Sequence, residues 1–132
     1  MNWTRALVGA PYRDGGRGPK AFDCWGIVRQ VFADQLGVDL PGYGDISADD
    51  LRRVAREMAR GRDSWPWAPV EVPQEFDVAV MARPGGRAPV HVGVCTGAGT
   101  VLHTEQATGA VLVPLDSPLI RFRLLGFRRY AP

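Results

Sequence analysis

The chain has 132 residues, of which 45% are hydrophobic and 23% are charged, with a formal net charge of +2 at pH 7. This composition is typical of one globular domain and excludes a disordered tail. The charge is too small to indicate a nucleic-acid partner. No apolar stretch approaches the ~20 residues of a membrane span, and no signal peptide is recognisable, so we expect synthesis in the cytoplasm without membrane insertion.

Thiol and imidazole groups are scarce in this chain. There are two cysteines, Cys24 and Cys95, and two histidines, His91 and His103. These numbers exclude paired zinc knuckles and a disulfide scaffold. The four residues also lack the close ligand pairs of a structural zinc site, so we predict no metal.

The first half of the chain predicts helices separated by loops. Residues 3–8 predict a short helix, and residues 12–20 a glycine-rich loop that can approach another group closely. A longer helix begins after Asp23 as N-cap and ends at Gly37. Its apolar positions recur at helical spacing: Ile27, Val28, Val31, Phe32 and Leu36.

A second helix is predicted over residues 48–60, opened by a capping box at Ser47 and Asp50. Its arginines are typical of a solvated face. Residues 65–69 contain two tryptophans and two prolines, which predict a rigid aromatic connector.

After residue 70 the hydrophobic period becomes two. Helices followed by closely spaced strands predict an α+β fold with an antiparallel sheet. The candidate strands are residues 76–82, 89–95, 100–105, 110–114 and 119–129, with turns at 84–86, 97–99 and 108–109.

Cys24 lies in the first turn of the first long helix. Free backbone N–H groups and the helix dipole favour a thiolate there. A thiol near its reference pKa of about 8.5 is mostly protonated at neutral pH, so a base or a cation is needed beside it.

His91 is the candidate base. Valines alternate with it in residues 89–95, which predicts that the valines face the core, that His91 faces away, and that Gly93 leaves room for another element. Folding the hairpin about residues 97–98 pairs position 91 with 103 or 104, so His91 and His103 become cross-strand neighbours. A nucleophile at a helix start, a base on a strand and an orienting group on the adjacent strand form the catalytic triad typical of cysteine hydrolases.

These residues alone leave structural alternatives open. Cys95 is predicted to be a small buried hydrophobe. The two histidines are also typical of satisfied polar residues at a sheet edge.

Longer motifs around these residues resemble a known family. Residues 11–16, 22–28, 91–94 and 101–103 are similar to motifs of the NlpC/P60 cysteine peptidases, and residues 75–80 resemble the family's Gly-Asp-Leu-Val strand. The similarity is strongest to small single-domain members found as phage-tail or gene-transfer-agent cell-wall peptidases. Two departures are Trp25, where a small residue is usual, and Phe76, where glycine is usual.

The resemblance implies a papain-like α+β fold, with N-terminal helices packed on a C-terminal antiparallel sheet in a single domain over residues 1–132. It implies hydrolysis of peptide bonds in peptidoglycan stems, typically between γ-D-glutamyl and diaminopimelate residues, without a cofactor. Phage-like tail or baseplate proteins are the implied partners, and the periplasm or cell wall the implied place of action. The alternatives are a catalytically silent tail-tip module, or an acyltransferase or amidase on the same fold.

The resemblance also implies a role for individual residues. Cys24 becomes the nucleophile, His91 the general base and acid, and His103 the orienting residue. The Tyr12 hydroxyl and the Cys24 backbone N–H would stabilise the oxyanion. The expected substrate-binding residues are Asp23, Trp25 and Arg13.

Overall fold

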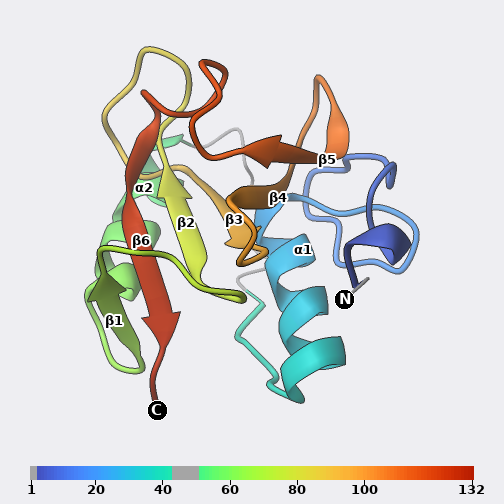
Figure 1. The fold of residues 1–132 in the computed structure, drawn as a ribbon, viewed down its shortest axis with the longest axis horizontal. Coiled ribbons are helices and arrows are strands. Elements are labelled where there is room, and N and C mark those ends of the chain that lie inside the picture. The colour runs from blue at the N-terminus through green and yellow to red at the C-terminus, as the bar shows by residue number, and fades with distance from the viewer. Residues whose placement is uncertain (1–2, 43–50) are drawn as a thin grey trace.

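The computed structural model describes residues 3–42 and 51–132, which form an antiparallel sheet with helices packed against it (Figure 1). The six strands have the order β1-β6-β2-β3-β4-β5, and the predicted α+β class is confirmed. No helix of the described ranges is long and apolar enough to cross a membrane. The elements are η1 (Trp3–Ala6), α1 (Cys24–Val31), η2 (Phe32–Leu36), α2 (Leu51–Arg62), β1 (Trp67–Val70), β2 (Val78–Met81), β3 (His91–Cys95), β4 (Thr100–Glu105), β5 (Gly109–Pro114) and β6 (Leu124–Tyr130).

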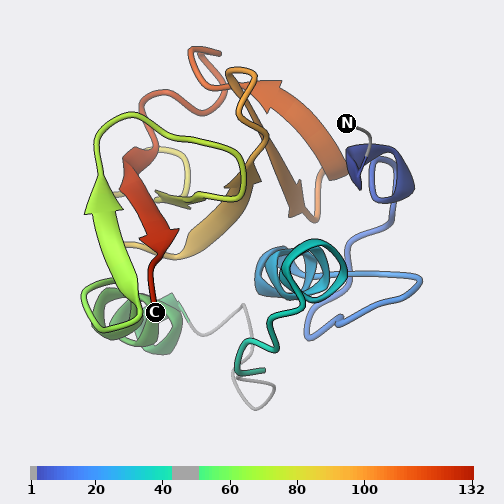
Figure 2. The same cartoon turned by 60° about the horizontal axis from the view of Figure 1, so that its bottom comes forward.

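The predicted limits of the first long helix are confirmed. The Asp23 carboxylate caps its start by accepting a hydrogen bond of 2.7 Å from the Gly26 N–H. A π-helical turn, η2, continues α1 and ends at Gly37, whose φ of +65° suits a residue without a side chain. The buried face of α1 packs against β3 and β4, and α2 lies beside β1 (Figure 2). Cys24 is therefore the first helical residue, beside the middle of the sheet.

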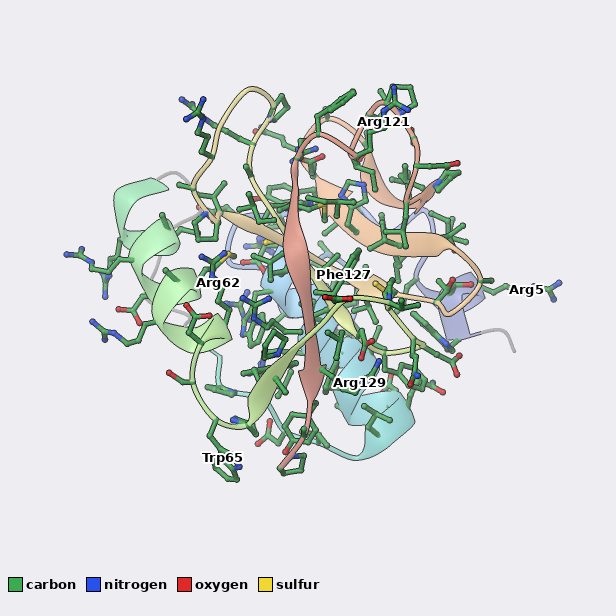
Figure 3. The ribbon with its side chains drawn as sticks, turned by 60° about the vertical axis from the view of Figure 1, so that its left-hand side comes forward. Arg5, Arg62, Trp65, Arg121, Phe127 and Arg129 are labelled. Atoms are coloured by element: carbon green, nitrogen blue, oxygen red, sulfur yellow. The ribbon has the colours of Figure 1, made fainter. Side chains whose placement is uncertain are left out.

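The segment predicted as a rigid connector is partly a strand. Residues Trp67–Val70 form β1, an edge strand that pairs with β6 through Trp67 and Tyr130 at one end. An edge strand tolerates Pro69 because the missing N–H faces away from its only neighbour. Trp67 packs edge-on against Tyr130 and close to Phe32, whereas Trp65 projects into solvent (Figure 3). The prediction missed β1 because its partner lies about 60 residues further along the chain.

Other boundaries also differ from the prediction: the short helix ends at Ala6, β2 covers Val78–Met81 and β3 begins at His91. The second helix, α2, continues to Arg62, two residues beyond its predicted end, and the predicted capping box at residues 47–50 lies outside the described residues. The last strand begins at Leu124 rather than at residue 119. The preceding residues form a turn instead, because the Ser117 carbonyl accepts hydrogen bonds from the N–H groups of Ile120 and Arg121.

The sheet is buried on both faces. One hydrophobic cluster lies between the sheet and α1 and includes Val92 and Val94. A second cluster on the other face includes Cys95 and is closed by Ile120 from the turn before β6. Cys95 is 1% exposed, which confirms it as a packing residue. His91 lies on the side of β3 opposite to Val92 and Val94, as the alternation predicted, and this side is covered too, so His91 is only 6% exposed.

Gly93 allows β3 and β4 to approach closely, as predicted. A Cβ atom on Gly93 would lie 2.7 Å from Val101 Cγ2, 2.8 Å from the Leu102 carbonyl oxygen and 3.0 Å from His103 Cβ. All three atoms belong to β4, and one of them is a backbone oxygen, so β4 must move if a side chain is added. The glycine thus sets the spacing between the strands that carry the two histidines.

We expect Gly93→Ala to destabilise the fold by about 1–3 kcal/mol, because the added methyl group overpacks the β3–β4 contact. Gly61→Ala in α2 is the matched control, since nothing lies within 4 Å of its Cβ position and alanine is the better helix former by about 1 kcal/mol. Urea denaturation of both variants measures the difference. Equal stability of the two variants would contradict the steric argument.

Candidate active site

Cys24 is held at the start of α1 by a tightly packed loop. The preceding segment is bound to the helix start through the Asp23 N–H, which donates to the Gly16 carbonyl oxygen at 3.1 Å. Gly26 has no room for a side chain, because a Cβ there would collide with the same Gly16 oxygen. Asp23 Oδ1 accepts a second hydrogen bond of 2.7 Å from Arg17 Nη1. The Asp-Cys-x-Gly sequence is therefore a structural requirement for placing the thiol.

The structure reverses the expected ionisation of Cys24. Burial, foremost, and the Asp23 carboxylate raise the pKa of the thiol to about 12. The backbone N–H groups of Val92 and Trp25 and the charge of Arg17 lower this pKa, but by less. The helix start thus does favour the thiolate, as predicted, but desolvation outweighs it. Cys24 is a neutral thiol in this structure at neutral pH.

His91 and His103 are brought together as predicted. His91 Nε2 lies 2.8 Å from His103 Nδ1, and the two rings meet nearly edge to face. The register differs from the predicted one, because Val94 pairs with Leu102 and Cys95 with Val101. Continued along β3, this register places position 91 opposite 105. The histidines are therefore diagonal neighbours, still within side-chain reach of each other.

Both imidazoles are neutral at neutral pH. Burial, foremost, lowers the pKa of His91 to about 3, although the Glu105 carboxylate acts in the opposite direction. Burial also lowers the pKa of His103, again against the influence of Glu105. Because His91 Nε2 is engaged with His103, the Nδ1 atom of His91 is the nitrogen left to exchange a proton with another group.

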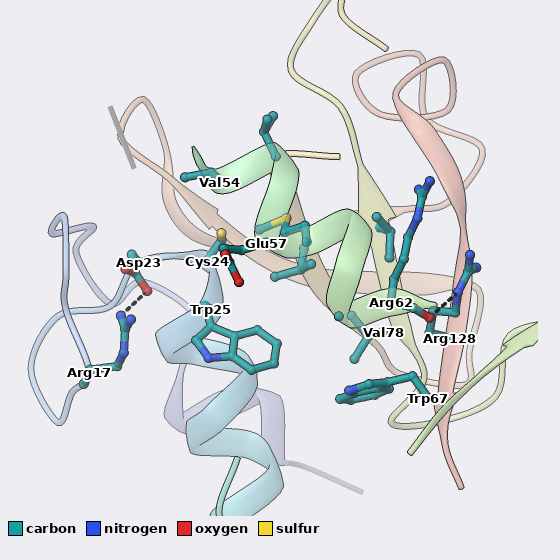
Figure 4. Close-up of a pocket in the computed structure, with 15 residues that line it drawn as sticks. Arg17, Asp23, Cys24, Trp25, Val54, Glu57, Arg62, Trp67, Val78 and Arg128 are labelled. Atoms are coloured by element: carbon teal, nitrogen blue, oxygen red, sulfur yellow. Dashed lines mark hydrogen bonds and ion pairs between the residues drawn. The ribbon is translucent and has the colours of Figure 1, made fainter. Parts of the chain in front are cut away.

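A pocket opens beside the thiol, between α1, α2 and the sheet (Figure 4). Its wall contains Asp23, Cys24 and Trp25, which are three of the residues predicted to form the site. Cys24 is partly exposed there. The remaining wall is mainly apolar, with charged side chains at its edges; its apolar residues include Val54, Met58, Trp67, Val78 and Val92, and its charged residues Arg17, Glu57, Arg62 and Arg128.

The structure does not bring every predicted residue to this pocket. Arg13 is exposed and does not line it, and neither do Tyr12, His91 and His103. Tyr12 is tied to the site by its backbone, through a bridge to Phe22, two residues before Cys24. No hydrogen bond joins the Cys24 sulfur to either histidine in the described ranges. Catalytic hydrogen bonds are often long in unliganded enzymes and shorten when substrate binds.

His91, His103 and Glu105 also form a group whose potential metal-binding atoms all lie within 4.8 Å of one another. Both Glu105 oxygens, however, accept hydrogen bonds from Arg123, at 2.9 and 2.8 Å. The facing histidine nitrogens are bound to each other. The same atoms are thus engaged in two hydrogen-bonded pairs, His91 with His103 and Glu105 with Arg123, an arrangement that favours proton handling over metal ligation.

Sequence inspection missed three charged residues at this site. Arg17 binds Asp23, and Arg123 binds Glu105 beside the histidines. Glu105 had a usable signal, because it follows His103 by two residues and so lies on the same side of the strand. The arginines carried no such signal, since each reaches its partner through the folding of a loop.

The chain matches the model of the NlpC/P60 family over residues 9–129. It belongs to the NlpC/P60 family. This family consists of cysteine peptidases, which agrees with a thiol at a helix start near a histidine pair.

Among relatives of the chain, the Murein DD-endopeptidase MepS/Murein LD-carboxypeptidase of Escherichia coli K12 is 26% identical over 121 residues, or 92% of this chain and 56% of that protein. Murein DD-endopeptidase MepH of the same strain is 30% identical, over 80% of this chain and 35% of that protein. Gamma-DL-glutamyl hydrolase of Bacillus subtilis 168 is 27% identical, over 93% of this chain and 27% of that protein. The chain thus spans about half the length, or less, of these relatives.

Solved structures show the same fold. The NlpC/p60 domain of the peptidoglycan hydrolase SagA superposes with a TM-score of 0.61 at 21% identity, over 95% of this chain and 89% of that one. An NlpC/P60 family protein from Bacillus cereus ATCC 10987 gives a TM-score of 0.66 at 24% identity, over 97% of this chain and 38% of that one. The papain-like NlpC/P60 fold expected from the motifs is confirmed.

The two departures from the family motifs have structural consequences. Phe76 has a φ of +73°, a backbone conformation that favours the glycine usual at this position. Its ring packs against Trp3 with centroids 5.5 Å apart, which offsets part of that strain. Trp25 lines the pocket, and its indole N–H donates to the Pro41 carbonyl oxygen at 2.6 Å. Trp25 therefore changes the wall of the pocket and leaves the thiol of Cys24 in place.

We expect Asp23→Asn to increase the rate at which iodoacetamide alkylates Cys24, by about three- to tenfold at a fixed pH. Asparagine caps a helix as well as aspartate does, so this change removes the charge but retains the cap. Removing a carboxylate that raises the thiol pKa lowers that pKa, and the thiolate fraction rises. Mass spectrometry of the Cys24 peptide measures the rate separately from Cys95.

Asp23→Ala is the companion variant, because it removes both the charge and the cap. It should lose about 0.5–2 kcal/mol of stability relative to Asp23→Asn. An unchanged or slower alkylation of Asp23→Asn would show that the carboxylate does not control the thiol.

Proposed function

We propose that this chain is a cysteine endopeptidase that hydrolyses peptide bonds in the stem peptides of bacterial peptidoglycan. The observation that carries the proposal is the position of Cys24, at the start of α1 and partly exposed in the wall of an open pocket. The family match and the murein endopeptidases among its relatives support the substrate class.

In the proposed reaction the thiol attacks as its proton leaves. His91 Nδ1 takes the proton from Cys24, and the sulfur forms a bond to the scissile carbonyl carbon. The Cys24 backbone N–H and the Tyr12 hydroxyl stabilise the oxyanion. His91 then gives the proton to the leaving amine as the C–N bond breaks, and an acyl-enzyme remains. Water, deprotonated by His91, hydrolyses the thioester and restores the thiol.

The neutral forms of the thiol and the imidazole agree with a mechanism in which the proton leaves Cys24 during the attack and not before it. A thiol with a pKa of about 12 and a histidine with a pKa of about 3 do not form an ion pair before substrate binds. The proton transfer is then coupled to the attack, and His103 stabilises the imidazolium through the 2.8 Å contact with His91 Nε2.

We further propose γ-D-glutamyl–diaminopimelate as the bond cleaved. The resemblance of the motifs at residues 11–16 and 22–28 supports this choice. The pocket adds apolar walls suited to an aliphatic side chain, and arginines at its edge suited to carboxylates. Asp23, Trp25 and Arg13 remain the proposed substrate contacts.

We also propose that a phage-like tail or gene-transfer-agent particle carries the protein to the periplasm or cell wall. The support is the resemblance of the same motifs to small tail-borne peptidases. Co-sedimentation of the tagged protein with purified particles tests this proposal, and recovery of the protein only in the unsedimented fraction would refute it.

A catalytically silent structural module on the same fold is the second candidate. One observation favours it: no hydrogen bond joins the Cys24 sulfur to His91 in the described part of the chain. The pocket that opens onto the thiol favours the enzyme instead. An acyltransferase or amidase would use the same residues but release a different product.

The deciding experiment treats purified sacculi and defined muropeptides with the wild type, Cys24→Ala and His91→Ala, and identifies products by mass spectrometry. We expect the wild type to release stem fragments with a new amino terminus, and both variants to lose about 10²-fold or more of the rate. Cys95→Ala is the matched control, because it removes the other thiol and should retain activity.

Each outcome selects a different conclusion. Absence of product from the wild type supports the silent module. Equal products from all proteins would refute the assignment of Cys24 and His91. Transfer of the acyl group to an added amine, in place of hydrolysis, supports the acyltransferase.

A further inference from the structure

Arg123 is a buried cation that the proposed reaction does not use. It lies in the turn before β6 and is 7% exposed. Its Nε donates to the Ala82 carbonyl oxygen at 2.7 Å, directly after β2. Its Nη1 and Nη2 donate to Glu105 Oε1 and Oε2 at 2.9 and 2.8 Å. Three hydrogen bonds thus fix the guanidinium, and both carboxylate oxygens are engaged by one planar group.

Glu105 connects this ion pair to the histidines. Its Oε1 atom lies 3.8 Å from His103 Nδ1, which is too long for a hydrogen bond. The same His103 nitrogen lies 2.8 Å from His91 Nε2. His103 Nδ1 is therefore hydrogen-bonded to His91 Nε2, while the Glu105 carboxylate acts on it through its charge. The position of one proton decides which of the two imidazole nitrogens is the donor.

The two neutral arrangements of the histidine pair have opposite consequences. If His91 Nε2 carries the proton and donates it to His103 Nδ1, then His91 Nδ1 keeps a free electron pair and can act as a base. If His103 Nδ1 carries the proton instead, His91 Nε2 must accept it and His91 Nδ1 is protonated. In that second arrangement His91 cannot accept a proton from the thiol.

A free carboxylate beside His103 Nδ1 would favour the second, inactive arrangement, because it attracts a proton to that nitrogen. Arg123 opposes this effect in two ways. It donates a hydrogen bond to each Glu105 oxygen, and its positive charge offsets the negative charge of the carboxylate. Glu105 on β4 and Arg123 before β6 act on both imidazoles through their charges, and His103 also acts on His91.

We propose that Arg123 is a positioning residue that restrains Glu105, so that His103 Nδ1 accepts the hydrogen bond of His91 Nε2 and His91 Nδ1 stays unprotonated. This inference rests on the proposed function only in naming His91 as the base. The placement of the protons is a property of the folded chain and can be measured without substrate.

The experiment uses ¹⁵N-histidine labelling and ¹⁵N chemical shifts of the imidazole nitrogens. The chain has only two histidines, so four nitrogens account for the whole imidazole spectrum. In the wild type at neutral pH we expect both histidines to carry their proton on Nε2. In Arg123→Gln we expect the proton of both rings to move to Nδ1, because Glu105 is no longer restrained.

Two further variants separate this effect from a loss of structure. Arg123→Lys retains the charge but cannot engage both oxygens as a planar fork, and should give a mixture of the two arrangements. Glu105→Gln combined with Arg123→Gln removes the unpaired carboxylate and should restore the wild-type arrangement. Backbone amide spectra of each variant report whether it is folded.

The proposal is overturned if either histidine of the wild type carries its proton on Nδ1, a result that needs no variant. It is also overturned if folded Arg123→Gln or Arg123→Lys keeps the wild-type shifts. If Arg123→Gln does not fold, Arg123→Lys and the double variant decide the question.

Turnover gives an independent readout. Arg123→Gln should lower kcat by about tenfold or more with little change in KM, and the double variant should recover part of that loss. If the wild type has no activity but the shifts follow the expected pattern, the proposed function fails and the positioning of the protons stands. If the wild type is active and the shifts do not change, the positioning inference alone fails.

Discussion

Asp23 Oδ1 accepts hydrogen bonds from the Gly26 N–H and from Arg17, and the placement of the thiol depends on both. The first bond begins α1 at Cys24, and the second ties the helix start to the preceding loop. The Gly16 carbonyl oxygen lies against Gly26 and accepts a hydrogen bond from the Asp23 N–H, so the loop is also held to the helix start by its backbone. The same carboxylate raises the pKa of the thiol. Position and reactivity of Cys24 are thus coupled through one side chain.

Burial then decides the protonation of the site. Desolvation disfavours the charged form of each group, so it raises the pKa of Cys24 and lowers the pKa of His91 and His103. A resting site without an ion pair requires that the proton move during the reaction. The arrangement of the His91–His103 pair beside the Glu105–Arg123 ion pair matters here, because it governs which imidazole nitrogen is free.

The wall of the pocket is built by residues from several elements, and one of them, Trp25, departs from the family motif. Trp25 and Trp67 form aromatic walls, and α2 adds the apolar side chains of Val54 and Met58. Trp67 itself belongs to β1, whose pairing with β6 brings it to the site. Changes in these walls alter which group can lie beside the thiol, whereas the helix start and the histidine strands are held by tight glycine contacts.

The sequence by itself determined α1 and predicted the reactive groups, because the relevant signals are local. Asp23 and Gly37 mark the helix ends, Gly93 marks a close strand contact, and the motif spacing predicts Cys24, His91 and His103 as site residues. Tertiary structure decided β1, the register between β3 and β4, and the ion pair of Arg123 with Glu105, since each depends on residues far apart in the chain. It also reversed the expected ionisation of Cys24. A helix start favours a thiolate locally, but the cost of desolvating that charge depends on everything packed around it.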